Sequence, residues 1–113
     1  MVNEIAGDLF VSQDVIADVA GHAALECYGV VGMAAPNAVD GLAKILPQSR
    51  LRRGILVSTD DEGTTVNLYV ILEHGVNINV VSTNLVEQVS FALKEFVENL
   101  KEVCVHVQGI KVR

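Results

Sequence analysis

Aromatic residues are scarce in this sequence. It has no tryptophan, and aromatic side chains make up only 4% of the 113 residues, although half of the residues are hydrophobic. A core built from this chain must therefore consist mainly of Val, Leu, Ile and Ala. Its largest expected members are Phe10, Phe91 and Phe96. The length suits one domain, which we expect to span residues 1–113.

Basic residues are also few. The chain has 8 Lys and Arg against 14 Asp and Glu, which gives a net charge of −6. Proteins that bind nucleic acid need basic side chains to neutralise phosphates, so the charge argues against a general nucleic-acid binder. It also argues against direct adhesion to an anionic membrane. One basic cluster exists, Arg50, Arg52 and Arg53. It fits either a solvated loop or a docking patch for an acidic partner.

Targeting signals and reactive-thiol motifs are missing as well. The two cysteines lie outside any C-x-x-C pattern. The first residues, "MVNEIAGDLF", lack the basic region and apolar run of a signal peptide. No apolar run approaches the roughly 18 residues that a membrane span needs. We expect a cytoplasmic protein with reduced thiols, no direct membrane insertion, and membrane association only through a partner.

The hydrophobic pattern predicts alternating strands and helices. Residues 7–12 are typical of a short strand, and 13–28 have helical spacing that ends near Gly29. Residues 34–53 carry both prolines and form a variable connection. In residues 64–74, Val66, Leu68, Val70 and Leu72 alternate with a half-exposed side that includes Tyr69 and Ile71.

The turn "TDDEG" between residues 54–58 and 64–74 predicts a hairpin. Residues 78–100 form the longest predicted helix, and residues 101–112 a closing strand. The order is therefore β-α-β-β-α-β. This order predicts an α+β sandwich in one domain, with a small antiparallel or mixed sheet and two helices packed on one face.

Two candidate catalytic groups are better explained structurally. Cys27 has His22 five residues earlier on the same helix, and about 500° of rotation points the two side chains apart. We therefore interpret Cys27 as a small buried hydrophobic residue. The carboxylates of Asp60, Asp61 and Glu62 fall in the hairpin turn, where acidic residues serve local hydrogen bonding. No catalytic residue is predicted.

Metal and nucleic-acid motifs are weak. Cys104 and His106 project to one face of the last strand, and His74 could approach from another strand as a third ligand, but no usual zinc-ligand spacing occurs. No metal or cofactor is therefore expected. The "GVVG" segment, Gly29–Gly32, resembles the backbone-clamping loop of KH domains. A small KH-like RNA-binding module that uses this turn with Arg50, Arg52 and Arg53 stays open as the alternative function.

The segment "EHGVNI", residues 73–78, is the best candidate contact surface. Glu73, His74 and Asn77 follow an apolar strand and precede the long helix. Gly75 suits a positive φ, and Asn77 or Asn79 suits a helix cap. The same side chains can also form a polar rim for a partner. The predicted partner-contact set is Arg50, Arg52, Arg53, Tyr69, Glu73, His74 and Asn77.

Four segments together resemble the alkaline-shock protein family of Gram-positive bacteria. They are "GDLFVSQDVIADVAGHAALECYGVVGM", "VNLYVILEHGVNI", "VVSTNLVEQVSFALKEFV" and "VCVHVQGIKV". They cover most of the chain, and only residues 34–53 fall clearly outside. The "ECYGVVGM" and "VHVQGI" pieces are the specific ones. The chain lacks the charged extensions of larger members and so resembles the short housekeeping type.

The resemblance implies a non-enzymatic adaptor or scaffold linked to cell-envelope stress or homeostasis. Such a protein works through protein contacts. The implied partners are a small membrane anchor protein or a cytosolic enzyme, together with self-association and no nucleic acid. The family supplies no catalytic residue, which agrees with the interpretation of Cys27 and of the hairpin carboxylates.

Overall fold

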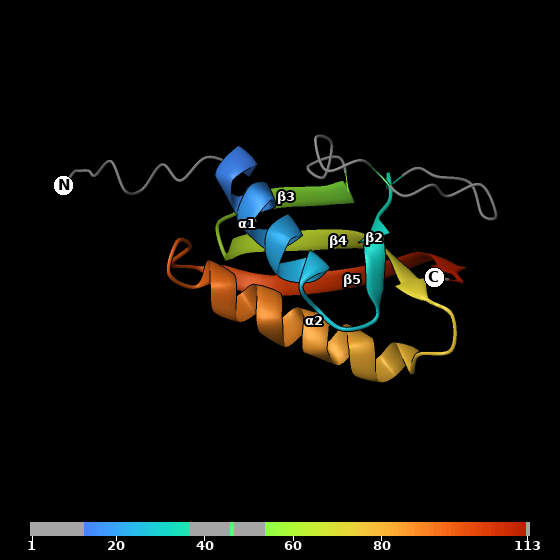
Figure 1. Ribbon diagram of the computed structural model, residues 1–113. Helices are drawn as coiled ribbons and strands as arrows, with labels where there is room; N and C mark the ends of the chain where they lie inside the picture. Colours follow the sequence, from blue (N-terminus) through green and yellow to red (C-terminus); the bar gives the residue numbers. More distant parts are fainter. Residues whose placement is uncertain (1–12, 37–45, 47–53, 113) are drawn as a thin grey trace.

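A computed structural model describes residues 13–36, 46 and 54–112. The strand predicted over residues 7–12 and most of the connection at 34–53 lie outside these described residues. The described elements are α1 (Gln13–Leu25), β2 (Val30–Met33), β3 (Ile55–Asp60), β4 (Gly63–Glu73), α2 (Ile78–Leu93) and β5 (Leu100–Lys111). The fold is the predicted α+β type, with both helices on one side of the sheet (Figure 1).

Strand β4 is the centre of a four-stranded mixed sheet. β5 runs parallel to it along nearly its whole length, from Thr64 to Glu73. β3 and β2 share the opposite edge: both are antiparallel to β4, β3 at Gly63–Leu68 and β2 at Val70–Leu72. The predicted hairpin is confirmed, because Asp60 of β3 pairs with Gly63 of β4.

The alternation in β4 places its valines and leucines under the helices, as predicted. The four apolar side chains of that face are fully buried: Val66, Leu68, Val70 and Leu72. On the opposite face Tyr69 is partly exposed, but Ile71 is fully buried. Ile71 packs with Ala34 and Val31 in a second, small apolar cluster. The expectation of a half-exposed Ile71 is therefore wrong, because the segment that leaves β2 covers it.

Small residues let α1 lie close to its neighbours. Ala17, Ala20 and Ala24 are buried on its inner face. The buried stripe of α2 consists of Val81, Leu85, Val89 and Leu93. The Gln88 side-chain amide of α2 donates a hydrogen bond of 3.1 Å to the Ala23 carbonyl of α1. The two helices are thus joined by a polar contact as well as by apolar packing.

The expectation that phenylalanine fills the core is wrong for Phe91 and Phe96. Phe91 is 71% exposed and Phe96 44% exposed, and Phe10 lies outside the described residues. Phe91 is two residues from the buried Val89 and Leu93, so it points about 200° away from their face of the helix. The helix ends at Leu93, earlier than expected, and Leu100 already belongs to β5.

The "GVVG" segment turns only once. Gly29 has a φ of 90°, and its carbonyl accepts a hydrogen bond of 2.8 Å from the Glu73 amide. The chain then enters β2 directly, so Gly32 pairs with Ile71 in the sheet. The sequence predicts a tight turn through both glycines; the structure places a turn at the first and a strand at the second.

The loop between β4 and α2 follows its prediction closely. Gly75 has a φ of 94°. Asn77 is the N-cap of α2, and its Oδ1 accepts a hydrogen bond of 3.1 Å from the Val80 amide. This bond satisfies one of the amides that an α-helix leaves unpaired at its start. Glycine and the cap together allow the chain to reverse direction in four residues.

Two glycine substitutions test how tightly the α1–β2 turn is packed. A Cβ at Gly29 would lie 2.8 Å from Val81 Cγ2, whereas a Cβ at Gly75 would meet nothing within 4 Å. Both sites have positive φ, so Gly75→Ala should lower the free energy of unfolding by about 1 kcal/mol. Gly29→Ala should lose about 1–3 kcal/mol more through overpacking. Urea denaturation measures both, and equal losses would show that Gly29 is packed no more tightly than Gly75.

Candidate functional site

Three of the predicted contact residues lie together at one end of the molecule. Glu73 ends β4, and His74 and Asn77 follow in the loop to α2. His74 is exposed, and its backbone amide donates a 2.7 Å hydrogen bond to the Lys111 carbonyl at the end of β5. The loop is therefore fastened to the sheet, while the His74 and Asn77 side chains face solvent.

The α1–β2 turn packs directly against this loop. Gly29 accepts the Glu73 amide hydrogen bond, and its Cα hydrogens face the side chains of Val76 and Val81. The neighbouring Tyr28 is 78% exposed. Two apolar residues of the first turn of α2 are also open to solvent, Ile78 at 44% and Val80 at 55%. The two segments bring exposed apolar side chains next to the predicted polar residues.

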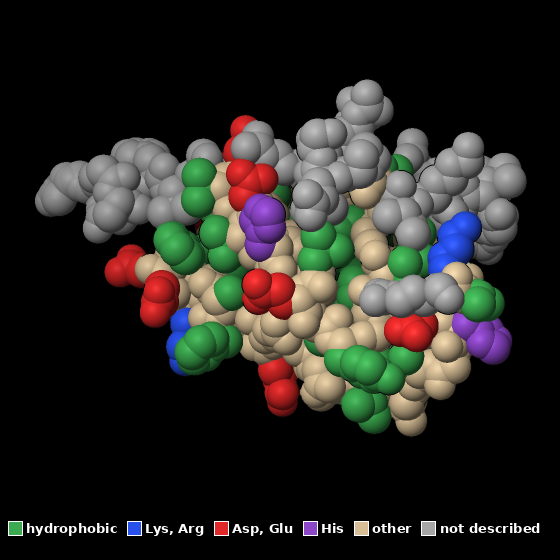
Figure 2. Space-filling view, viewed as in Figure 1, with side chains coloured by type: hydrophobic (Ala, Val, Ile, Leu, Met, Phe, Trp, Pro, Cys, Tyr) green, Lys and Arg blue, Asp and Glu red, His purple; other side chains and the backbone are tan. Residues whose placement is uncertain are grey.

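We call this region the loop-end surface. It consists of Tyr28, Glu73, His74, Asn77, Ile78 and Val80. Figure 2 shows hydrophobic side chains gathered where the α1–β2 turn meets the start of α2, with acidic and histidine side chains near them. Tyr28, Ile78 and Val80 were not predicted. Val80 could have been found, because the buried Val81 and Leu85 fix the phase of the helix and turn Val80 outward.

The other predicted contact residues do not join this surface. Tyr69 lies on the sheet face opposite the helices, where its ring stacks on His106 with centroids 4.5 Å apart and planes at 12°. His106 Nε2 forms a hydrogen bond of 3.0 Å with Asn67 Oδ1. These side chains form a separate polar and aromatic group across β4 and β5. Arg50, Arg52 and Arg53 lie outside the described residues.

The KH-like interpretation of Gly29–Gly32 finds no counterpart in the fold. A KH clamp loop joins two helices and keeps its backbone free for the nucleic acid. Here the segment joins a helix to a strand, and Val30 is buried in the core and pairs with Leu72. The backbone that would contact a phosphate chain is occupied by the sheet.

Cys27 lies in the hydrophobic core, as predicted from its helical position. It is 5% exposed, and burial raises the pKa of its thiol. His22, the nearest histidine in sequence, is exposed on α1. A nucleophilic cysteine needs an accessible thiolate and a neighbouring base. The burial of Cys27 denies it the first of these.

The three side chains considered as metal ligands lie on β5 and just after β4. Cys104 and His106 pair with neighbouring outward positions of β4, Asn67 and Tyr69. His74 lies beyond the far end of that strand. Among residues 13–36, 46 and 54–112, no three His, Cys, Asp or Glu side chains converge as metal ligands would. Burial, and secondarily Glu102, raises the pKa of the Cys104 thiol.

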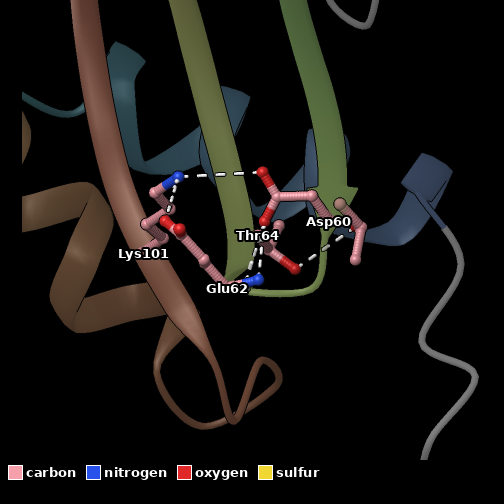
Figure 3. A network of polar contacts seen from close by, with 6 residues as sticks. Asp60, Glu62, Thr64 and Lys101 are labelled. Atoms are coloured by element: carbon pink, nitrogen blue, oxygen red, sulfur yellow. Dashed lines mark hydrogen bonds and ion pairs between the residues drawn. The ribbon is translucent and has the colours of Figure 1, made fainter.

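The hairpin carboxylates stabilise their own turn (Figure 3). Asp60 Oδ1 accepts hydrogen bonds from the amides of Glu62 and Gly63, at 2.8 and 3.2 Å. Lys101 Nζ of β5 lies 2.9 Å from Glu62 Oε1 and 3.7 Å from Asp60 Oδ2. The Glu62 amide and then Lys101 lower the pKa of Asp60. Glu62 and Asp60 raise the pKa of Lys101. These groups are engaged with each other, which favours the structural interpretation.

The lowered pKa of Asp60 predicts an acid-sensitive contribution to stability. Its stabilisation is complete above the ordinary carboxyl pKa and is lost as the pH falls through the lower folded pKa. Asp60→Asn keeps an acceptor for the turn amides but cannot titrate. It should therefore lose less stability than the wild type between about pH 5 and about pH 2. Denaturation at a series of pH values tests this. Asp61→Asn removes the same charge from the same turn and should keep the wild-type slope.

The burial of Cys27 predicts a difference between the two thiols. In the native protein at neutral pH, iodoacetamide should modify Cys27 at least about tenfold more slowly than the partly exposed Cys104. Mass spectrometry of peptides gives both rates from one sample. Denatured protein, in which the two rates should converge, is the control. Faster labelling of Cys27 in the native state would show that its thiol is accessible and activated.

Comparison with known proteins places the chain in a family. A family model described as the alkaline-shock protein 23 family, with a cell envelope-related function, matches residues 1–112. The uncharacterized protein YloU of Bacillus subtilis is 36% identical over 94% of this chain and 90% of its own length. The uncharacterized protein Spy1614 of Streptococcus pyogenes is 38% identical over 98% of this chain and 93% of its own.

These relatives come from Gram-positive bacteria, as the sequence resemblance predicts. No solved structure matches the chain significantly. In the part of the chain that the structure describes, neither helix has the length and apolar character needed to cross a membrane. The match over nearly the whole chain and the two relatives lead to one conclusion: the protein is a member of the alkaline-shock protein 23 family, whose function is related to the cell envelope.

Proposed function

We propose that this protein is a non-enzymatic adaptor or scaffold in a cell-envelope process, and that it binds a protein partner through the loop-end surface. The observation that supports this most is the exposure of Tyr28, Ile78 and Val80 on two segments that pack against each other at Gly29. Exposed apolar groups rimmed by polar residues are typical of protein contact sites.

The composition of the surface suits a partner segment with an apolar centre. From His74 to Val86 the sequence contains no Asp, Glu, Lys or Arg, although the whole chain carries a charge of −6. Tyrosine offers a large ring together with a hydroxyl, and such residues often dominate binding energies. Around them, His74 and Asn77 supply polar atoms at the rim. A small membrane anchor protein or a cytosolic enzyme with an exposed apolar segment fits this chemistry.

The surface is held rigidly before any partner arrives. The Glu73 amide is bonded to Gly29, the His74 amide to Lys111, and the Val80 amide to the Asn77 cap. A partner that binds a fixed surface loses less of its binding free energy to ordering loops. The arrangement therefore supports a constant docking platform that works without chemistry of its own.

In-cell crosslinking followed by affinity purification and mass spectrometry tests the proposal. Tyr28→Ala and Val80→Glu should each reduce recovery of specific partners by about tenfold or more, because exposed anchors at an interface centre carry much of the affinity. Phe91→Ala is the matched control, since Phe91 is similarly exposed but lies near the other end of α2. It should leave recovery unchanged. Equal recovery with all three variants and the wild type would contradict the proposed surface.

A further inference from the structure

Strand β5 has an edge that the described structure leaves without a partner strand. β5 is 12 residues long, and in the described residues it pairs only with β4. A long strand edge presents backbone amides and carbonyls that readily add another strand. Natural proteins usually protect such an edge with a cover, a bulge or charges. The side chains of β5 indicate what could pair with it.

The exposure of the helix-side residues of β5 increases along the strand. Val103 and Val107 pair with Val66 and Val70, which are fully buried. Val103 is 7% exposed, but Val107 is 36% exposed and Ile110 43%. The helix side of β5 is therefore apolar along its length but open to solvent toward its end. An added strand would bury this apolar side.

The central segment of β5 is complementary to itself. Residues 103–107 read "VCVHV". If a second copy pairs antiparallel with the symmetry axis at Val105, Val105 faces its own counterpart. Val103 then faces Val107 of the second copy, and the reverse pair follows by symmetry. Paired residues in a sheet share a face. The helix-side positions of both strands therefore form a continuous ladder of valines, while Cys104 faces His106 of the second copy.

Neighbouring registers are less favourable. An axis at His106 places the two His106 side chains opposite each other and leaves Val103 without a valine opposite it. An axis at Cys104 leaves Val107 without one, and an axis at Val107 leaves both Val103 and Val105 without one. Of these registers, only the axis at Val105 sets all three valines of residues 103–107 opposite valines.

We propose that a second copy of this chain pairs antiparallel along β5, with the symmetry axis at Val105, and joins two sheets into one. A contact of this kind uses the same strand in both copies, so it closes at the dimer. The dimer presents two loop-end surfaces, which would let one assembly engage two copies of a partner. The inference does not depend on the proposed function, because it uses a different edge of the molecule.

The first test is the oligomeric state of purified protein over a range of concentrations, by sedimentation equilibrium. The wild type should show a monomer–dimer equilibrium. Val107→Lys should raise the dimer dissociation constant by at least about tenfold, because it sets a charge against Val103 of the second copy. Leu56→Lys is the control, since Leu56 is 47% exposed on β3 and should leave the equilibrium unchanged. A monomeric wild type, or a Val107→Lys dimer of full strength, would overturn the proposal.

The second test fixes the register. In a Cys104→Ser background, Val105→Cys should form an intermolecular disulfide on mild oxidation, because paired residues of antiparallel strands have Cβ atoms about 4.5–5.5 Å apart. Leu56→Cys in the same background should remain monomeric under the same conditions. Crosslinking at position 56 but not 105 would show that another surface associates.

The loop-end variants keep the two proposals separate. Val80→Glu should leave the dimer dissociation constant unchanged while it reduces partner recovery. Val107→Lys should do the opposite unless the partner requires two copies. If Val80→Glu alone abolished the dimer, the second copy would be bound at the loop-end surface, and the proposed pairing along β5 would be wrong.

Discussion

The pairing of β4 with three other strands is the constraint on which the rest of the structure depends. β5 occupies one edge of β4, and β3 and β2 divide the other edge between them. Both helices then cover the face that carries Val66, Leu68, Val70 and Leu72. Since this strand is buried on both edges and on one face, a change in its register would move every apolar side chain to the wrong side.

The two ends of β4 are stabilised by different kinds of contact. At its start, the hairpin turn is stabilised by Asp60 and joined to β5 by Lys101. At its finish, Glu73 holds the α1–β2 turn, and the loop that follows is capped by Asn77. The first end is closed by polar contacts among its own side chains. At the second end the backbone amides of Glu73, His74 and Val80 are hydrogen-bonded, and the His74 and Asn77 side chains are exposed.

Local patterns predicted what depends on near neighbours in the sequence. The alternation in β4, the positive φ of Gly75, the Asn77 cap and the hairpin turn all follow from residues within a few positions of one another. Contacts between distant segments were not visible. Strand β2 exists because Val30–Met33 pair with a strand some forty positions later, and Ile71 is buried by Ala34. Tyr28 belongs to the loop-end surface because the fold brings its turn beside α2, and this neighbour is distant in the sequence.

The parallel pairing of β4 with β5 has a consequence for the order in which the chain folds during synthesis. A parallel pair needs a crossover connection, which here contains α2. The hairpin of β3 and β4 depends on contacts close in sequence and can form early, whereas one edge of β4 stays unpaired until residues 100–111 have left the ribosome. A nascent chain paused before that point would expose one edge of the central strand of the described sheet, so rapid completion, or shielding by a chaperone, would protect it from aggregation.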